Sequence, residues 1–192
     1  MPAPRLTGVE YELMISGQPY LPSDPELTAA RARSRSLEFR FNHTPPEHAD
    51  ERAAILRELF GRVGESVEIE PNLHVDYGVN ISIGERFYAN AHCVLLDVAA
   101  ISIGDDTMLA PGVQLLTATH PVDPVERVSG RELGFPITIG NRVWLGGGVI
   151  VGPGVTIGDD VVVGSGAVVV KDIPNGVVAV GNPARVLRSA LA

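Results

Sequence analysis

Aliphatic residues recur at every sixth position over much of this 192-residue chain, from residue 63 to residue 169. Near-identical tetrads belong to the same repeat: ISIG at 81–84, ISIG at 101–104, ITIG at 137–140 and VTIG at 155–158. The longest unbroken register consists of Ile139, Leu145, Val151, Ile157, Val163 and Val169. An internal repeat therefore governs the larger part of the chain, and its fold has to satisfy a period of six.

A period of six fits extended backbone, because side chains alternate between the faces of a strand and every sixth residue returns to one face. Glycine after these positions permits a turn where a Cβ atom would clash. Three such sides close a coil of about 18 residues, and stacked coils enclose one aliphatic side chain per side. With 21 glycines and only 5% aromatic residues, the chain suits so narrow a core. We predict an all-β parallel β-helix, because a β-sandwich does not hold one register for so long.

The first 62 residues follow a different pattern and predict a short helical segment. Only 2 of the 21 glycines precede residue 61, and apolar residues recur at helical spacing. Ser23 and Glu26 fit a capping box, and Thr44 before Pro45 repeats that signature, with Gly61 as a stop. We expect a helical segment at 1–62, a β-helix domain at 63–186 with an inserted loop at 121–136, and a tail at 187–192.

Charge and composition exclude several classes of protein. The longest uncharged stretches, such as 143–158, are broken by Gly and Pro, and no basic region followed by an apolar run opens the chain. We therefore expect neither a membrane span nor a secretory signal. The lone Cys93 cannot form an intrachain disulfide, so a cytoplasmic location and a packing role for Cys93 are expected. Nucleic-acid binding is excluded by the net charge of −8.

Basic residues nevertheless collect at the C-terminal end. Residues 63–166 carry 4 basic and 13 acidic side chains, whereas residues 167–192 carry 3 basic and 1 acidic. The three are Lys171, Arg185 and Arg188. Such side chains suit the phosphates of an anionic cofactor. The alternative is a solvent-exposed C-terminal tail that binds no ligand.

The run 139–169 resembles the hexapeptide-repeat acyltransferases, and other stretches resemble their maltose O-acetyltransferase branch, with galactoside O-acetyltransferase as a near relative. These stretches are DYG at 76–78, FYAN at 87–90, LDV at 96–98, APGV at 110–113, TATHP at 117–121 and NRVW at 141–144. The resemblance implies a left-handed β-helix with a short N-terminal helical segment. It also implies acetyl transfer from acetyl-CoA to a mono- or disaccharide hydroxyl, in a homotrimer with active sites between subunits and without a metal.

Acetyl transfer to an alcohol requires a base for the hydroxyl proton and a donor for the oxyanion, but no covalent acyl-enzyme. His120 is the candidate base, because it lies where the repeat breaks and a polar loop with five charged residues begins. A structural histidine is the alternative from the residues alone. The resemblance places the catalytic histidine of the family on this Thr-His-Pro.

The resemblance also assigns further roles. It implies that Asn90 is catalytic and holds the acetyl group or its oxyanion. It implies cofactor contacts at Asn90, Trp144, Gly147, Ser165 and Val170, besides Lys171, Arg185 and Arg188, and acceptor contacts at Asp76, Asp97 and Arg31. The galactoside branch has an acidic residue after Asp97, where this chain has Val98. We therefore expect a maltose or glucose type of acceptor, with a galactoside or an oligosaccharide left open.

Two other functions fit a β-helix. Zinc carbonic anhydrases of the γ class bind their metal with three histidines, and His74 and His92 lie 18 residues apart, about one coil. The slip at 81–83 breaks that stacking, and no histidine follows His120 in its loop. A β-helix that is only a scaffold is the third possibility, but a scaffold has no need to break register at His120.

Overall fold

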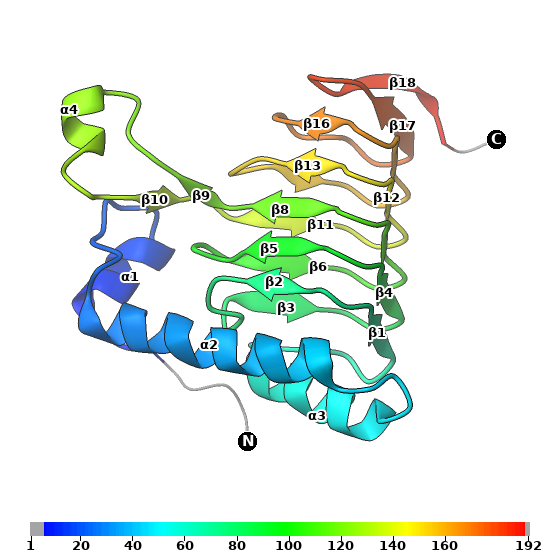
Figure 1. Ribbon diagram of the computed structural model, residues 1–192. Coiled ribbons are helices and arrows are strands. Elements are labelled where there is room, and N and C mark those ends of the chain that lie inside the picture. The colour runs from blue at the N-terminus through cyan, green and yellow to red at the C-terminus, as the bar shows by residue number, and fades with distance from the viewer. Residues whose placement is uncertain (1–5, 191–192) are drawn as a thin grey trace.

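The computed structural model describes residues 6–190 and contains three parallel sheets around one aliphatic core (Figure 1). Sheet I, in order, consists of β1 (Val67–Ile69), β4 (Phe87–Ala89), β7 (Met108–Leu109), β12 (Trp144–Leu145), β15 (Val162–Val163) and β17 (Val177–Val180), with β18 (Arg185–Ser189) antiparallel at its edge. Sheet II consists of β2 (His74–Val75), β5 (Val94–Leu96), β8 (Gln114–Leu116), β13 (Ile150–Val151) and β16 (Val168–Val169). Sheet III consists of β3 (Ile81–Ile83), β6 (Ile101–Ile103), β11 (Ile137–Ile139) and β14 (Thr156–Ile157).

The chain visits the sheets in the order I, II, III and returns to sheet I one coil higher. All six residues of the long hexad register are buried, with at most 1% of any of them exposed. The core differs from the prediction in one respect. Each side buries two residues per coil, one at the corner and one in the strand, as Val149 and Val151 do. Because both slots face inward, Ile81 and Ile83 are both buried, and the two-residue slips in the sequence leave the core intact.

The corners between sheets I and II contain left-handed backbone in successive coils. Gly112, Gly148 and Gly166 adopt φ angles of 70°, 67° and 73°, and His92 adopts 65° at the equivalent place in a lower coil. Glycine reaches this region without the steric cost that a Cβ atom brings. His92 is therefore a corner residue, and Cys93 beside it is buried in the core as expected. Burial raises the pKa of the Cys93 thiol to about 11, which disfavours a nucleophilic thiolate.

In the described chain from residue 6 onward, three helices precede the coils: α1 (Val9–Ile15), which the sequence did not predict, α2 (Pro25–His43) and α3 (Ala49–Leu59). Helices α2 and α3 lie across the lower end of the β-helix (Figure 1). Their buried residues, among them Leu37, Phe41 and Leu56, extend the same core.

Both predicted capping boxes are wrong. Asp24, not Ser23, caps α2 by accepting the N–H groups of Glu26 and Leu27 at 2.9 and 3.2 Å. The Glu26 carboxylate instead accepts the N–H groups of residues 7 and 8 at 3.1 and 2.6 Å. Thr44 ends α2, and its hydroxyl donates to the Arg40 carbonyl at 2.7 Å. A helix start and a helix end use the same small polar residues, so the Thr-Pro-Pro signature pointed to the wrong helix terminus.

The expected loop at 121–136 forms the tip of a projecting arm, defined here as residues 118–136 (Figure 1). Its two strands, β9 (Ala118–Thr119) and β10 (Leu133–Gly134), pair antiparallel, and α4 (Pro124–Arg127) lies between them. Tyr20 and Glu132 exchange backbone N–H···O bonds of 3.1 Å, which join the arm to the N-terminal segment. None of the helices within residues 6–190 combines the length and apolar character that crossing a bilayer requires.

Candidate active site

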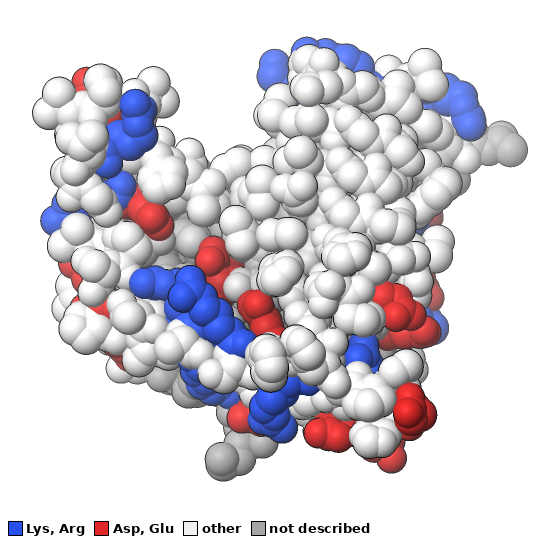
Figure 2. Space-filling view, viewed as in Figure 1, with Lys and Arg blue, Asp and Glu red and all other residues white. Residues whose placement is uncertain are grey.

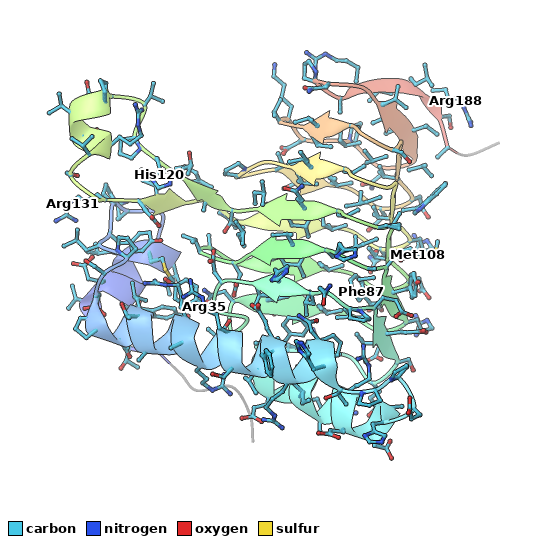
Figure 3. All side chains as sticks on the ribbon, in the orientation of Figure 1. Arg35, Phe87, Met108, His120, Arg131 and Arg188 are labelled. Atoms are coloured by element: carbon cyan, nitrogen blue, oxygen red, sulfur yellow. The ribbon has the colours of Figure 1, made fainter. Side chains whose placement is uncertain are left out.

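A cleft of about 310 Å³ lies between the N-terminal helices, the end of β2 and the base of the arm. It contains three of the residues that the sequence predicted for the site: His120, Asp76 and Arg31. The other lining residues are Tyr20, Pro22, Arg35, Tyr77, Val98, Ala118 and Glu132. In space-filling view the surface is hollowed between the arm and the β-helix, with acidic atoms next to basic ones (Figure 2). Figure 3 labels His120 on the arm and Arg35 on α2, the two elements that enclose the cleft. We call it the acceptor cleft.

Arg31 is held rigidly at one wall of the acceptor cleft. Its guanidinium donates to the Tyr77 hydroxyl and to the Pro22 carbonyl, each at 2.6 Å, and lies 5.6 Å from the centre of the Tyr77 ring. The guanidinium opposes the effect of burial on the Tyr77 phenol, whose pKa nevertheless rises to about 12. Tyr77 therefore stays a neutral hydroxyl near neutral pH and keeps its hydrogen bond with Arg31.

The Asp76 carboxylate is one of the groups of the acceptor cleft that are free to bind a ligand. Within residues 6–190 it accepts no hydrogen bond, although the Asp76 main chain is held by the Ser34 hydroxyl at 2.8 Å. Burial raises the pKa of Asp76, and the nearby Arg31 and Arg35 guanidinium groups oppose that rise. A half-buried carboxylate beside fixed cations is suited to accept hydrogen bonds from hydroxyl groups.

The expected acceptor contact of Asp97 is not available, because its side chain is fully buried. One carboxylate oxygen accepts the N–H groups of Asp76 and Tyr77 at 3.1 and 2.8 Å, and the other accepts that of Asn80 at 3.1 Å. Burial raises the pKa of Asp97 to about 6, and these N–H donors oppose the rise. Asp97 therefore shapes the 76–80 loop, which presents Asp76 to the cleft. The predicted direct contact of Asp97 with the acceptor is therefore not supported by its position in the structure.

Replacing Asp97 with asparagine is expected to destabilise the fold by about 2 kcal/mol and to raise the KM for the acceptor, since an amide NH₂ would face the Asn80 N–H. Thermal unfolding and acceptor kinetics measure the two effects. Asp105→Asn is the matched control, because Asp105 accepts the Glu85 N–H in a stacked corner where Asn141 has the same role one coil higher. Equal stability of the two variants would contradict the role of Asp97.

Two residues that the sequence did not single out, Tyr20 of the N-terminal segment and Glu132 of the arm, line the acceptor cleft. The Tyr20 hydroxyl donates to the Glu132 carboxylate at 2.8 Å, and burial raises the Tyr20 pKa, so this phenol stays protonated. A tyrosine in a chain so poor in aromatic residues was the available signal, but its partner lies 112 positions away. His120 is exposed at the base of the same arm.

A second group of predicted residues lies at the opposite end of sheet II. Asn90, Gly147 and Ser165 occupy stacked corners between sheets I and II, joined by backbone bonds from Gly112 to Ala91, Gly148 to Pro111 and Gly166 to Gly147, each of 2.9 Å. The Asn90 side-chain oxygen accepts the Ala91 N–H at 2.7 Å, which orients the amide. We call this column the corner column.

Exposed apolar side chains follow sheet I beside the corner column. Trp144 is 48% exposed and pairs directly with Met108, which is 49% exposed. Tyr88 pairs with Met108 on the other side, and Val162 follows Trp144. This row of side chains is continuous over four strands, and we call it the apolar ladder. Figure 3 labels Met108 on the side of the β-helix that carries β4 and β12.

The remaining predicted cofactor residues divide between the two ends of sheet II. Val170 and Lys171 are exposed directly after β16, at the end where β8 leads into the arm and His120. Arg185 and Arg188 are exposed on β18, which follows the topmost turn of the corner column. Within one chain, the width of sheet II thus separates Asn90 from His120, and the predicted residues form two half-sites.

The histidines of the zinc hypothesis do not form a metal site in the described chain. His74 pairs with Glu38 at 3.5 Å, and His92 occupies a corner. No group of three His, Cys, Asp or Glu side chains within residues 6–190 is placed to hold a metal ion.

Comparison with known proteins agrees with this architecture. Residues 13–64 match the maltose acetyltransferase hexapeptide capping motif, and residues 136–171 match the bacterial transferase hexapeptide family with six repeats. The chain is 45% identical to galactoside O-acetyltransferase of Escherichia coli K12, over 84% of this chain and 80% of that protein. The predicted left-handed parallel β-helix with an N-terminal helical segment is thereby confirmed.

Two solved structures superpose closely. A maltose O-acetyltransferase from Clostridium difficile 630 has a TM-score of 0.95 and 49% identity, covering 97% of this chain and 100% of the other. A hexapeptide-repeat acetyltransferase from Vibrio cholerae, complexed with acetyl coenzyme A, has a TM-score of 0.90 and 36% identity, covering 96% and 100%.

Proposed function

Because the chain belongs to the hexapeptide-repeat acetyltransferases with a maltose acetyltransferase capping motif, we propose that it transfers the acetyl group of acetyl-CoA to a sugar hydroxyl. The observation that carries the proposal is the acceptor cleft, in which the exposed His120 faces Asp76 and Arg31. A carboxylate and guanidinium groups around a small polar cleft suit a ligand rich in hydroxyl groups.

In the proposed reaction, the His120 imidazole removes the proton from the acceptor hydroxyl as its oxygen attacks the thioester carbonyl. The carbonyl oxygen gains the negative charge of the tetrahedral intermediate, and the Asn90 amide and a backbone N–H of the corner column stabilise it. Collapse of this intermediate breaks the carbon–sulfur bond and forms the acetyl ester. The proton on His120 passes to the departing thiolate, which leaves as CoA.

One chain holds the acceptor cleft and the corner column at opposite ends of sheet II, so we propose that the active site forms between two copies in a homotrimer. His120, Asp76 and Arg31 of one subunit would face Asn90 of its neighbour. The half-exposed apolar ladder beside Asn90 supports this arrangement, since a row that includes Trp144 gains stability when a partner removes it from water.

The cofactor is acetyl-CoA, and we place it along the corner column. Its thioester would lie between Asn90 and Gly147, beside the Trp144 ring, and its pantetheine arm would pass Ser165 toward the basic upper end. Gly147 suits such an approach, because even an added Cβ would meet only the Pro111 carbonyl, at 3.6 Å. Arg185 and Arg188 of one subunit, and Lys171 beside Val170 of its neighbour, would meet the phosphates.

Replacing Lys171 with alanine is expected to raise the KM for acetyl-CoA about fivefold and to leave kcat unchanged, because an exposed contact to phosphate contributes about 1 kcal/mol to binding of substrate and transition state alike. Steady-state kinetics with varied acetyl-CoA test this. Arg57→Ala, which removes an exposed cation from α3, serves as the control. A fall in kcat alone would place Lys171 elsewhere than at the phosphates.

Release of CoA with a panel of sugars is the direct test of the proposed function. Glucose, maltose, a galactoside and an oligosaccharide should differ in kcat/KM, and glucose and maltose should exceed the galactoside, because Val98 lines the cleft where the galactoside branch is expected to have an acidic residue. No acceleration of CoA release by any of these sugars would refute a sugar acceptor.

A further inference from the structure

A second and larger cleft, of about 600 Å³, lies under the lowest coil and has no role in the function proposed above. The end of α2, the segment at 44–46, α3 and residues 67–71 form its walls. Its volume lies within the range of small-molecule sites and is about twice that of the acceptor cleft. We call it the basal cleft.

The basal cleft is preformed, because polar side chains tie its walls together. The Arg52 guanidinium donates to the carbonyl groups of Phe41 and Thr44, each at 3.1 Å, and to that of Ile69 at 2.8 Å. It also packs 4.2 Å from the centre of the Phe41 ring. The Asn42 amide exchanges two 2.9 Å hydrogen bonds with the Leu73 main chain. A ligand would therefore find the cleft open and would not have to order its walls.

The basal cleft lies one strand spacing below Asn90, the residue beside which acetyl transfer is proposed to occur. Ile69 pairs with Ala89, and the Glu70 N–H donates to the Ala89 carbonyl at 2.8 Å. Glu70 therefore lies under Asn90 at the spacing of adjacent strands, about 4.8 Å. Glu68, which also lines the cleft, pairs with Tyr88 at the foot of the apolar ladder. An acceptor that reacts beside Asn90 thus needs to extend by only one strand spacing to enter the basal cleft.

The residues that line the basal cleft indicate which class of ligand it can bind. Glu68 and Glu70 have no side-chain hydrogen bond or ion pair within residues 6–190, so two carboxylates are available to accept hydrogen bonds from hydroxyl groups. Pro45, Pro46 and Ala49 supply apolar surface with no polar side chain. This mixture suits a pyranose ring, whose hydroxyl edge needs acceptors and whose C–H face needs apolar contact. An alkyl chain would remove both carboxylates from water without giving them partners. The Arg52 guanidinium also lines the cleft but is committed to three backbone carbonyl groups, so the charged groups without partners that a ligand meets are the two carboxylates.

We propose that the basal cleft is a second acceptor subsite, which binds the sugar unit next to the one that is acetylated, so that di- or oligosaccharides are preferred to monosaccharides. This inference rests on the proposed sugar acetyltransferase function. The acetylated unit lies in the acceptor cleft of one subunit, and its neighbouring unit extends past Asn90 into the basal cleft of the next.

Kinetics with glucose, maltose and maltotriose, each with saturating acetyl-CoA, test the subsite. The wild-type protein is expected to use maltose with about tenfold higher kcat/KM than glucose, the equivalent of one hydrogen bond to a charged group. Ala49→Trp, which fills the cleft from an exposed position, should abolish that preference and leave glucose turnover unchanged. Glu70→Gln should reduce the preference severalfold. Ala29→Trp is the control, because Ala29 is exposed on α2 and lines no described cleft.

Each outcome is decisive. Equal kcat/KM for glucose and maltose, or an unchanged maltose preference in Ala49→Trp, overturns the subsite while the proposed function stands. A preference for octyl glucoside over maltose that Ala49→Trp removes means that the cleft takes an alkyl chain, and this also overturns the proposal. Failure of every sugar to release CoA from the wild-type protein refutes the proposed function itself, and the subsite with it.

Discussion

Replacing His120 with alanine should lower kcat for acetyl transfer by 10²–10⁴, the range that a positioned general base contributes. The variant should keep its fold, because His120 is exposed at the base of the arm and contributes nothing to the aliphatic core. The KM for acetyl-CoA should change little, since the proposed phosphate contacts lie elsewhere. Release of CoA at saturating acetyl-CoA and acceptor measures the effect.

His48→Ala is the matched control for this experiment. His48 is exposed before α3 and pairs with Glu51 at 3.4 Å, and it does not line the acceptor cleft. Its removal should leave kcat within twofold of the wild type, as is usual for surface substitutions. Turnover by His120→Ala within tenfold of the wild type would mean that another group takes the hydroxyl proton.

The core of the coils was the part of this structure easiest to predict, because its buried aliphatic residues recur every six positions in the sequence. Every member of the hexad register from Ile139 to Val169 is buried. Only the number of buried residues was predicted wrongly: each side of a coil buries two residues, and the prediction was one. A corner valine such as Val149 lies two residues before its strand partner Val151, and both alternate toward the axis.

The helix boundaries were harder to predict, because the deciding contacts are tertiary. Asp24 caps α2, and the Glu26 carboxylate that a capping box would use is engaged 18 positions away, with Gly8. No local pattern reveals such a contact. Tyr20 and Glu132 form the junction of the arm with the N-terminal segment across 112 positions for the same reason.

The candidate site was predictable as a set of residues but not as an arrangement. Asp76, Arg31 and His120 share the acceptor cleft, whereas Asp97 lies beneath it and shapes the loop that presents Asp76. Charge alone does not distinguish a ligand contact from a buried carboxylate that accepts three backbone N–H bonds. The separation of His120 from Asn90 could be inferred only when each was placed at its own end of sheet II.

That separation predicts complementation between two inactive variants. In the proposed homotrimer, His120→Ala should destroy one half-site and Asn90→Ala the other, so each variant alone should be nearly inactive. In a mixed trimer, one of the three interfaces joins an intact His120 to an intact Asn90. Random assembly of equal amounts makes three quarters of the trimers mixed, so about one quarter of the wild-type activity should return.

The experiment requires the two chains to be unfolded together and refolded, and activity to be compared with that of the same chains refolded separately. A pairing of His120→Ala with Asp76→Ala is the matched control. Both residues line the acceptor cleft of the same chain, so no interface in that mixture regains a complete site, and activity should stay at the level of the two variants refolded separately. Recovery in the control, or none with Asn90→Ala, would contradict a site divided between His120 of one subunit and Asn90 of the next. A quarter of the activity in the first mixture and none in the second is the pattern expected only when the two ends of sheet II meet across a subunit boundary.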